Sequence, residues 1–278
     1  MEVQELPSDM SSTNTNPRAG FTLIELLVIA PIAVIIVAVI VLVMVNLVGD
    51  TLIAQQRNTA SYETQSGLDQ IEQDVRLSAA ILQTTGALSS PQGSDRGTTA
   101  FTATTGTLNG STNGPALLLK AYATTTDPMN SSRTLIYTNQ PSASCTTPTA
   151  NDPLTYTIVY YVKADPDNSS KMALWRRTIV PTTGTICSGT PWQKNSCFPG
   201  VAGALCITND RMVVSNISSV VVLYYFETSN PYTVTTQTSL ASASDNPTSV
   251  KVTINTSKTV GTKTITSAMS LYVSRINQ

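Results

Sequence analysis

The stretch LLVIAPIAVIIVAVIVLVMVNLVG, residues 26–49, contains no charged residue. A helix needs about 20 predominantly apolar residues to cross the hydrocarbon core of a bilayer. A surface helix of a soluble protein would carry a polar face, whereas this segment is apolar all round. We therefore expect a single membrane-spanning helix here. A central helix buried in a soluble core is the less favoured alternative.

The residues before this span are arranged differently from an ordinary secretory signal. Such a signal places its small-residue cleavage site after an apolar core of about 7–15 residues. Here residues 1–19 are mostly polar, and the small residue Gly20 stands immediately before the apolar segment, which begins at Phe21. Cleavage after Gly20 would leave the hydrophobic segment on the mature protein.

The string GFTLIELLV, residues 20–28, resembles the class III signal of type IV pilins and type II secretion pseudopilins. The resemblance implies that a prepilin peptidase cleaves between Gly20 and Phe21 and then methylates the new amine of Phe21. It implies a single-pass protein of the cytoplasmic membrane whose head lies outside the cytoplasm, at the cell surface or in the periplasm once assembled. The other partners it implies are further pilins or pseudopilins, which contact the N-terminal helix, and the inner-membrane assembly platform.

Glu25 lies inside this apolar segment, where a carboxylate is costly unless it is paired or serves a function. The resemblance implies that Glu25 pairs with the Phe21 amine of a neighbouring subunit during assembly, so that two charges are neutralised together. The alternative is that Glu25 lies near the lipid headgroups and reaches water. Pro31 follows in the same helix and cannot donate a hydrogen bond to the carbonyl of Leu27, so we expect a kink or a loosening there.

The helix is expected to continue beyond the membrane, because no proline occurs between Asp50 and Leu82. Apolar residues recur at three- and four-residue steps from Leu68 onward, as on one face of a helix. Gly67 is a point at which this helix is expected to be weak. The predicted organisation of this half is a cleaved leader at 1–20, a transmembrane helix at 21–49 and an amphipathic continuation of the helix at 50–85.

From residue 86 to residue 278 the sequence favours strands and turns. Short apolar runs alternate with segments rich in Thr, Ser, Asn and Gly. We therefore predict an α+β fold with a pilin-like layout, in which the long N-terminal helix is followed by a mostly antiparallel β-rich head at 86–278. The expected strands are 117–122, 135–137, 156–162, 172–180, 217–226, 249–255 and 263–273, and residues 163–170 are expected to connect the third and fourth as a hairpin.

Two segments refine the resemblance. Residues 68–79, LDQIEQDVRLSA, resemble the acidic helix segment that follows the span in J-type minor pseudopilins and W-type minor pilins. A tyrosine strand at 160–162, followed by LWRR at 174–177, resembles their central hairpin. The resemblance implies a minor subunit that initiates assembly or lies near the tip of a type IV pilus, a competence pilus or a type II secretion pseudopilus. The alternatives are a major structural pilin and a membrane-anchored surface-binding module, such as an adhesin or DNA receptor, that does not assemble.

All four cysteines follow the span: Cys145, Cys187, Cys197 and Cys206. An even number of cysteines in an exported head predicts disulfides. Three pairings are possible, and local closure favours Cys197–Cys206 together with Cys145–Cys187. A tetrathiolate zinc site is the alternative, but the sequence lacks the C-x-x-C spacing typical of such sites. We therefore expect no metal site.

Two further groups of polar residues allow a functional and a structural interpretation. Asp165, Asp167 and Asn168 could offer oxygen ligands to calcium, but they are also ordinary turn residues, and we favour the turn. Arg176 and Arg177 could bind an anionic strand. Adjacent strand residues face opposite sides of a sheet, however, so the two arginines cannot share one binding patch. We favour a solvated face for them.

The composition excludes several chemistries. The chain has 16 Lys and Arg against 17 Asp and Glu, and it has no histidine. Catalysis and metal binding that depend on imidazole are therefore excluded, and the charge balance does not indicate binding to a nucleic acid backbone. The sequence also lacks a phosphate-binding loop and a nucleophile elbow. We expect neither an enzyme nor a bound cofactor.

Overall fold

The structure is a computed structural model of the 278-residue chain. It describes residues 22–83, 101–103, 106–108, 115–139, 151–181, 186–187, 189–229, 232–237 and 247–276. The chain divides into two units, Met1–Leu52 and Ile53–Gln278, and helix α1 (Leu23–Leu77) contributes residues to both.

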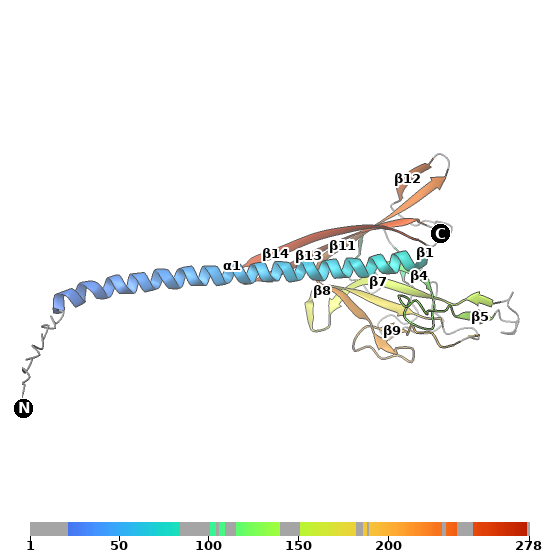
Figure 1. Cartoon of the computed structure of the whole chain (residues 1–278), viewed down its shortest axis with the longest axis horizontal. Helices are drawn as coiled ribbons and strands as arrows, with labels where there is room; N and C mark the ends of the chain where they lie inside the picture. Colours follow the sequence, from blue (N-terminus) through green and yellow to red (C-terminus); the bar gives the residue numbers. More distant parts are fainter. Residues whose placement is uncertain are drawn as a thin grey trace, which may run out of the picture. The chain divides into compact units, whose positions relative to one another are not determined.

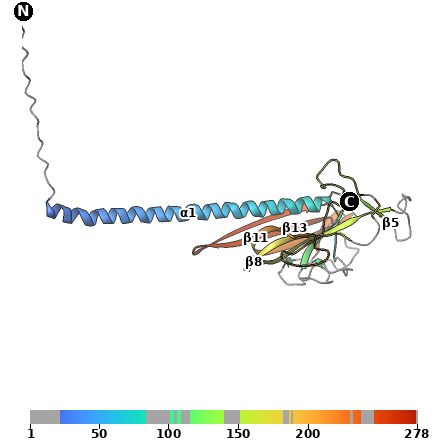
Figure 2. The same ribbon diagram turned by 90° about the horizontal axis from the view of Figure 1, so that it is seen from below.

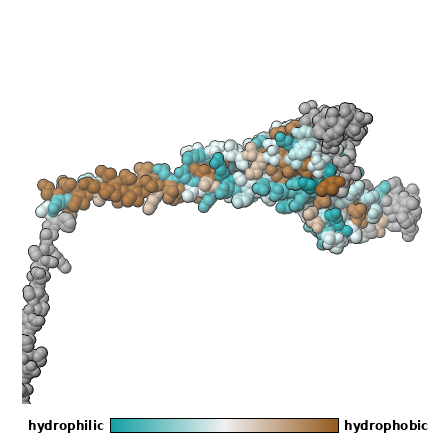
Figure 3. Space-filling view, turned by 45° about the horizontal axis from the view of Figure 1, so that its top comes forward, coloured by the Kyte–Doolittle hydropathy of each residue, from teal (hydrophilic) through white to brown (hydrophobic). Residues whose placement is uncertain are grey.

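The first unit contains the apolar part of α1, whose large hydrophobic side chains are exposed from Leu23 to Val48. This stretch is the brown segment of Figure 3. Within the described residues, one helix is long and apolar enough to cross a membrane, as predicted. The helix remains unbroken at Pro31, where the sequence predicts a kink or a loosening.

Helix α1 ends at Leu77, and the next four residues form strand β1 (Ser78–Ile81). β1 pairs antiparallel with β4 (Pro115–Tyr122). The prediction that the helix continues to residue 85 is therefore wrong, because the helix ends at Leu77 and residues 78–81 form a strand. Its apolar residues fit the helical spacing, but pairing with a strand far along the chain decides their conformation.

The second unit is organised around one sheet. Within the described residues ten strands form this sheet, and its main order is β1-β4-β7-β8-β11-β13-β14, with all neighbours in this order antiparallel. β2 pairs with β4, while β3 and β12 pair with β11; two small sheets, β5–β6 and β9–β10, lie outside it. The fold class is α+β, as predicted.

The remaining strands have the following bounds: β2 (Thr102–Ala103), β3 (Gly106–Leu108), β5 (Tyr137–Asn139), β6 (Asn151–Pro153), β7 (Thr155–Asp165), β8 (Asn168–Ile179), β9 (Ser196–Cys197), β10 (Thr208–Asn209), β11 (Arg211–Ser229), β12 (Tyr232–Gln237), β13 (Ser249–Val260) and β14 (Lys263–Ser274).

Six of the seven predicted strands correspond to β4, β7, β8, β11, β13 and β14. The seventh, 135–137, is wrong in its bounds, because Leu135 forms only an isolated bridge and β5 begins at Tyr137. The connection between β7 and β8 is also shorter than predicted, since the two strands pair as far as Asp165 and Asn168. Asp165 accepts a hydrogen bond from the Asp167 amide at 3.0 Å, as an ordinary turn residue does.

The last part of α1 packs against the sheet through Leu68, Ile71 and Val75, which lie on one helix face. Figures 1 and 2 both show β11, β13 and β14 alongside this part of the helix. Gly67 allows the close approach, because a Cβ atom there would lie 2.3 Å from Cγ2 of Val214. Gly67 therefore serves packing and does not interrupt the helix.

The opposite side of the sheet carries a second apolar cluster, which includes Phe101, Trp175 and Phe198. The rings of Trp175 and Phe198 meet edge to face, with their centroids 4.9 Å apart. The central strands β7 and β8 are therefore covered on both sides, by α1 on one and by the segment around Phe198 on the other.

The residues that follow β14 contact β1, the strand at the other end of the sheet order. Nη1 of Arg275 donates to the carbonyl of Ala79 in β1 at 2.5 Å, and its Nε donates to the carbonyl of Pro247 at 3.1 Å. The amide of Ile276 also lies 3.4 Å from the carbonyl of Arg76 near the end of α1. These contacts bring the two ends of the sheet together around the end of the helix.

Candidate functional site

The first turn of α1 carries a reciprocal set of hydrogen bonds between Thr22 and Glu25. The amide and hydroxyl of Thr22 each donate to Oε2 of Glu25 at 3.0 Å, and the amide of Glu25 donates to the Thr22 hydroxyl at 3.3 Å. This arrangement is a capping box, which satisfies two backbone N–H groups that lack partners inside the helix. In apolar surroundings such a cap is valuable, because an unsatisfied backbone group there costs several kcal/mol.

Only one carboxylate oxygen of Glu25 takes part in the cap. Among the described residues no group donates to Oε1, so this oxygen can accept a further hydrogen bond. The spacing Thr22-x-x-Glu25 is itself a sequence signature of a helix start, so the cap could have been predicted. Gly20 and Phe21, the expected cleavage and methylation positions, lie outside the described residues.

In the head, Asp74 of α1 binds two central strands of the sheet. Its side chain is nearly buried, and the residue is 7 % exposed. Arg176 of β8 donates to both carboxylate oxygens, from Nε at 2.6 Å and from Nη2 at 3.2 Å, and the hydroxyl of Tyr160 in β7 donates at 2.5 Å. Burial, reinforced by the charge of Asp74, raises the pKa of Tyr160 well above its usual value, so its hydroxyl keeps the donated proton.

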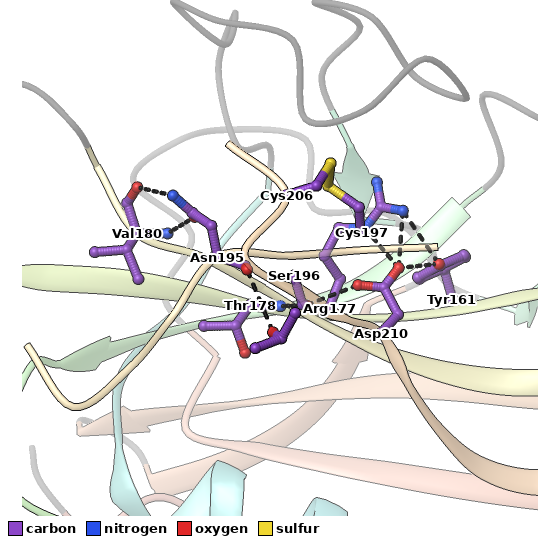
Figure 4. The surroundings of a disulfide bond; sticks show 10 residues. Tyr161, Arg177, Thr178, Val180, Asn195, Ser196, Cys197, Cys206 and Asp210 are labelled. Atoms are coloured by element: carbon purple, nitrogen blue, oxygen red, sulfur yellow. Dashed lines mark hydrogen bonds and ion pairs between the residues drawn. A yellow bond between two sulfur atoms is a disulfide. The ribbon is translucent and has the colours of Figure 1, made fainter. Parts of the chain in front are cut away.

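A second ion pair lies on the other side of the sheet (Figure 4). Arg177 of β8 is 0 % exposed, and its guanidinium lies 2.8 Å from Oδ2 of Asp210. The hydroxyl of Tyr161 donates to the same oxygen at 2.5 Å, and the hydroxyl of Ser196 donates to Oδ1 at 2.7 Å. Both oxygens of this buried carboxylate are therefore satisfied, as a buried charge requires.

The two arginines do face opposite sides of β8, as adjacent strand residues must. The prediction that they lie on a solvated face is wrong, however. Another segment packs on each side of β8, and each of these segments contains one carboxylate that pairs with an arginine. Asp74 of α1 pairs with Arg176, and Asp210, which precedes β11, pairs with Arg177. Both arginines are therefore paired with a carboxylate; Arg177 is fully buried, whereas Arg176 remains partly exposed.

Cys197 and Cys206 form a disulfide with their Cα atoms 5.3 Å apart, as predicted. It lies beside the Arg177–Asp210 pair (Figure 4), and the amide of Asp210 donates to the carbonyl of Cys197 at 2.6 Å. Cys187 is also disulfide-bonded, but its predicted partner Cys145 lies outside the described residues. The alternative of a tetrathiolate zinc site is wrong, because the sulfurs of Cys197 and Cys206 are bonded to each other.

Replacing both Cys197 and Cys206 by serine should lower the free energy of unfolding by about 2–3 kcal/mol. The disulfide closes a short loop, with a sequence separation of 9 residues, and a loop of this size limits the entropy of the unfolded chain by about that amount. Urea unfolding of the double variant and the parent measures the difference. A Ser169→Ala variant at an exposed position, which leaves all four cysteines in place, is the control. Equal stability of the double variant and the parent would contradict the prediction.

Comparisons with protein-family models, with curated proteins and with solved structures found no match for this chain. Inferences about its function therefore depend on the motif at the start of α1 and on the chemistry of the described residues.

Proposed function

We propose that the chain is a minor pilin or pseudopilin, trimmed after Gly20 and assembled through its N-terminal helix. The machine would be a type IV pilus, a competence pilus or a type II secretion pseudopilus. The observation that carries the proposal is helix α1 itself, whose first part is exposed and apolar on all sides and whose last part packs into a β-rich head.

An apolar surface of this size needs an apolar environment. The large side chains from Leu23 to Val48 are about half exposed or more in the single chain, and each would gain on the order of 1.5–3 kcal/mol on leaving water. A bilayer supplies that environment before assembly, and the helices of neighbouring subunits supply it afterwards. A subunit that exchanges lipid for other helices keeps this surface out of water throughout.

Glu25 fits the proposed assembly contact. Oε2 is used in the helix cap, and Oε1 can accept a hydrogen bond from the protonated Phe21 amine of a neighbouring subunit. The cap and the contact between subunits therefore do not compete for the same oxygen. Pairing would neutralise a carboxylate that is otherwise costly in apolar surroundings.

The chemistry of the head supports a location outside the cytoplasm. The Cys197–Cys206 disulfide and the disulfide-bonded Cys187 are typical of oxidising compartments. In the proposed topology, the single span lies in the cytoplasmic membrane and the head faces the cell surface or the periplasm. A place at the initiation of assembly or at the tip is supported by the resemblance of residues 68–79 and 160–177.

Mass spectrometry of the membrane-extracted protein, made in cells that contain a prepilin peptidase, tests the proposal. The expected mature product begins at Phe21 and carries one added methyl group on its amine. The variant Gly20→Leu, which removes the small residue at the cleavage position, should keep residues 1–20. A mature product that begins after Gly49 and is released into the medium would refute the proposal.

A further inference from the structure

A polar cleft of about 440 Å³ lies in the second unit, beside the end of α1. Its floor includes Tyr156 of β7 and both Arg176 and Thr178 of β8. A turn at 127–129 and the segment 192–194 form further walls. The volume falls within the range of sites that bind small molecules.

The helix contributes a polar face to this cleft. Gln70, Gln73 and Asp74 line it together with Leu77, and their three- and four-residue steps place them on one side of α1. Oε1 of Gln70 also accepts a hydrogen bond from Nη1 of Arg211 at 3.0 Å. The side of the helix that faces the cleft is thus distinct from the apolar face that packs on the sheet.

Another part of the lining is an extended segment that carries an exposed tryptophan. Burial alternates along it, so that Trp192 and Lys194 are exposed whereas their neighbours Pro191, Gln193 and Asn195 are buried. Trp192 is 52 % exposed, and both it and Lys194 line the cleft. Alternation in an extended chain places these two side chains on the same side.

The buried neighbours fix this segment in place. Oε1 of Gln193 accepts from the amide of Thr124 at 3.0 Å, and its Nε2 donates to the Thr124 hydroxyl at 2.9 Å. Asn195 exchanges hydrogen bonds with both backbone groups of Val180, at 2.5 and 3.2 Å. The amide of Trp192 donates to the carbonyl of Thr124 at 2.9 Å. The backbone that carries the indole is therefore anchored at Trp192 itself and at the next residue, Gln193.

We propose that this cleft binds a saccharide. A sugar ring offers hydroxyl groups that both donate and accept hydrogen bonds, and its C–H face can stack on an indole, whose π face is electron-rich. The side chain of Gln73 makes no hydrogen bond within the described residues, so its amide supplies a neutral donor and acceptor. Gln70 still offers its Nε2 donors, while the hydroxyls of Thr178 and Thr208, bonded to Arg176 and Asn195, each keep further hydrogen-bonding capacity. Trp192 supplies the aromatic face. The site would thus recognise a polyhydroxylated ring through both its hydroxyl groups and its C–H face.

Other classes of ligand fit the cleft less well. An apolar ligand would cover Gln73, whose side-chain amide has no partner among the described residues, and burying an unpaired amide is costly. A small anion would find Arg176 already paired with Asp74, and a second carboxylate, Asp127, lining the same cleft. Arg211 also lines the cleft, with its Nη1 bound to Oε1 of Gln70. Lys194 donates to the carbonyl of Pro191 at 3.0 Å, so its ammonium is also engaged.

The test uses the full chain in a detergent with a zwitterionic, sugar-free headgroup. Chitotriose, cellobiose, lactose and maltotriose are titrated in turn, with inorganic phosphate and triglycine as probes of the competing classes. Of the two tryptophans, Trp175 is buried, so a shift of the intrinsic fluorescence reports chiefly on Trp192. Ligand-observed NMR measures the affinity of variants that lack this residue.

At least one saccharide should bind, and Trp192→Ala should weaken its binding about tenfold or more, a difference of about 1.4 kcal/mol. Trp192→Phe should restore part of the affinity, and Gln73→Ala should weaken binding severalfold. Tyr62→Ala, which removes an exposed aromatic ring outside the cleft, should change nothing. Unchanged thermal unfolding of each variant shows that its fold is intact.

The proposal is overturned if none of the four saccharides binds the parent chain, or if only phosphate or triglycine binds. It is equally overturned if a saccharide binds the intact Trp192→Ala variant as tightly as the parent. These outcomes do not depend on cleavage after Gly20 or on filament assembly, so the cleft and the proposed pilin function are tested separately.

Discussion

Replacing Arg177 by methionine should lower the free energy of unfolding by about 3–5 kcal/mol. Removing one partner of a buried ion pair leaves the other charge without compensation, and measured costs fall in this range. Asp210 would keep its bonds from Tyr161 and Ser196 but lose its cation in a site whose side chains are fully buried. A loss of this size is a large fraction of the stability of a typical domain.

Urea unfolding of the full chain, followed by circular dichroism, measures this loss. Lys171→Met is the matched control, because it makes a similar change at an exposed position of the same strand. The double variant Arg177→Met with Asp210→Asn removes the uncompensated charge as well, so it should recover part of the stability. If Arg177→Met is as stable as Lys171→Met, the buried pair contributes nothing to the stability of the head.

Glu25→Ala should abolish incorporation into filaments while the leader is still removed and the protein remains in the membrane. The substitution removes the carboxylate that we propose to pair with the Phe21 amine of a neighbour, and an amine left unpaired in apolar surroundings would oppose docking. Immunoblotting of sheared filaments and of membrane fractions measures the distribution of the protein. Normal amounts of the variant in filaments would refute the role.

Two further variants separate the charge of Glu25 from its part in the helix cap. Glu25→Gln removes the charge but can still form a capping box, so it should fail to assemble. Thr22→Val removes the hydroxyl that takes part in the cap and keeps the carboxylate, so it should still assemble. The reverse pattern would show that Glu25 acts through the cap alone.

The sequence predicted the features that depend on local composition. The apolar run beginning at Leu26 is sufficient to identify the long helix, and alternation with turn residues located most of the strands. The disulfide between Cys197 and Cys206 was also predictable, because its partners lie close together in the chain. Each of these features is set by residues within a short window.

The missed features depend on residues that are distant in the sequence. Asp74 and Arg176 are separated by 102 positions, and Arg177 and Asp210 by 33. No local pattern indicates which carboxylate will reach which arginine, so the charged residues of the hairpin were expected at the surface. The end of α1 was misplaced for the same reason, since β1 forms only by pairing with β4. The cleft lined by Gln73 and Trp192 likewise gathers residues from several elements.

The adjacent arginines of β8 have a consequence for how the sheet finds its alignment. A shift of this strand by one residue moves every side chain to the opposite face. In one direction Trp175 would replace Arg176 opposite Asp74, and in the other Thr178 would replace Arg177 opposite Asp210. Either misaligned hairpin would leave one buried carboxylate without its arginine, so the two acids together favour the native register over both one-residue shifts.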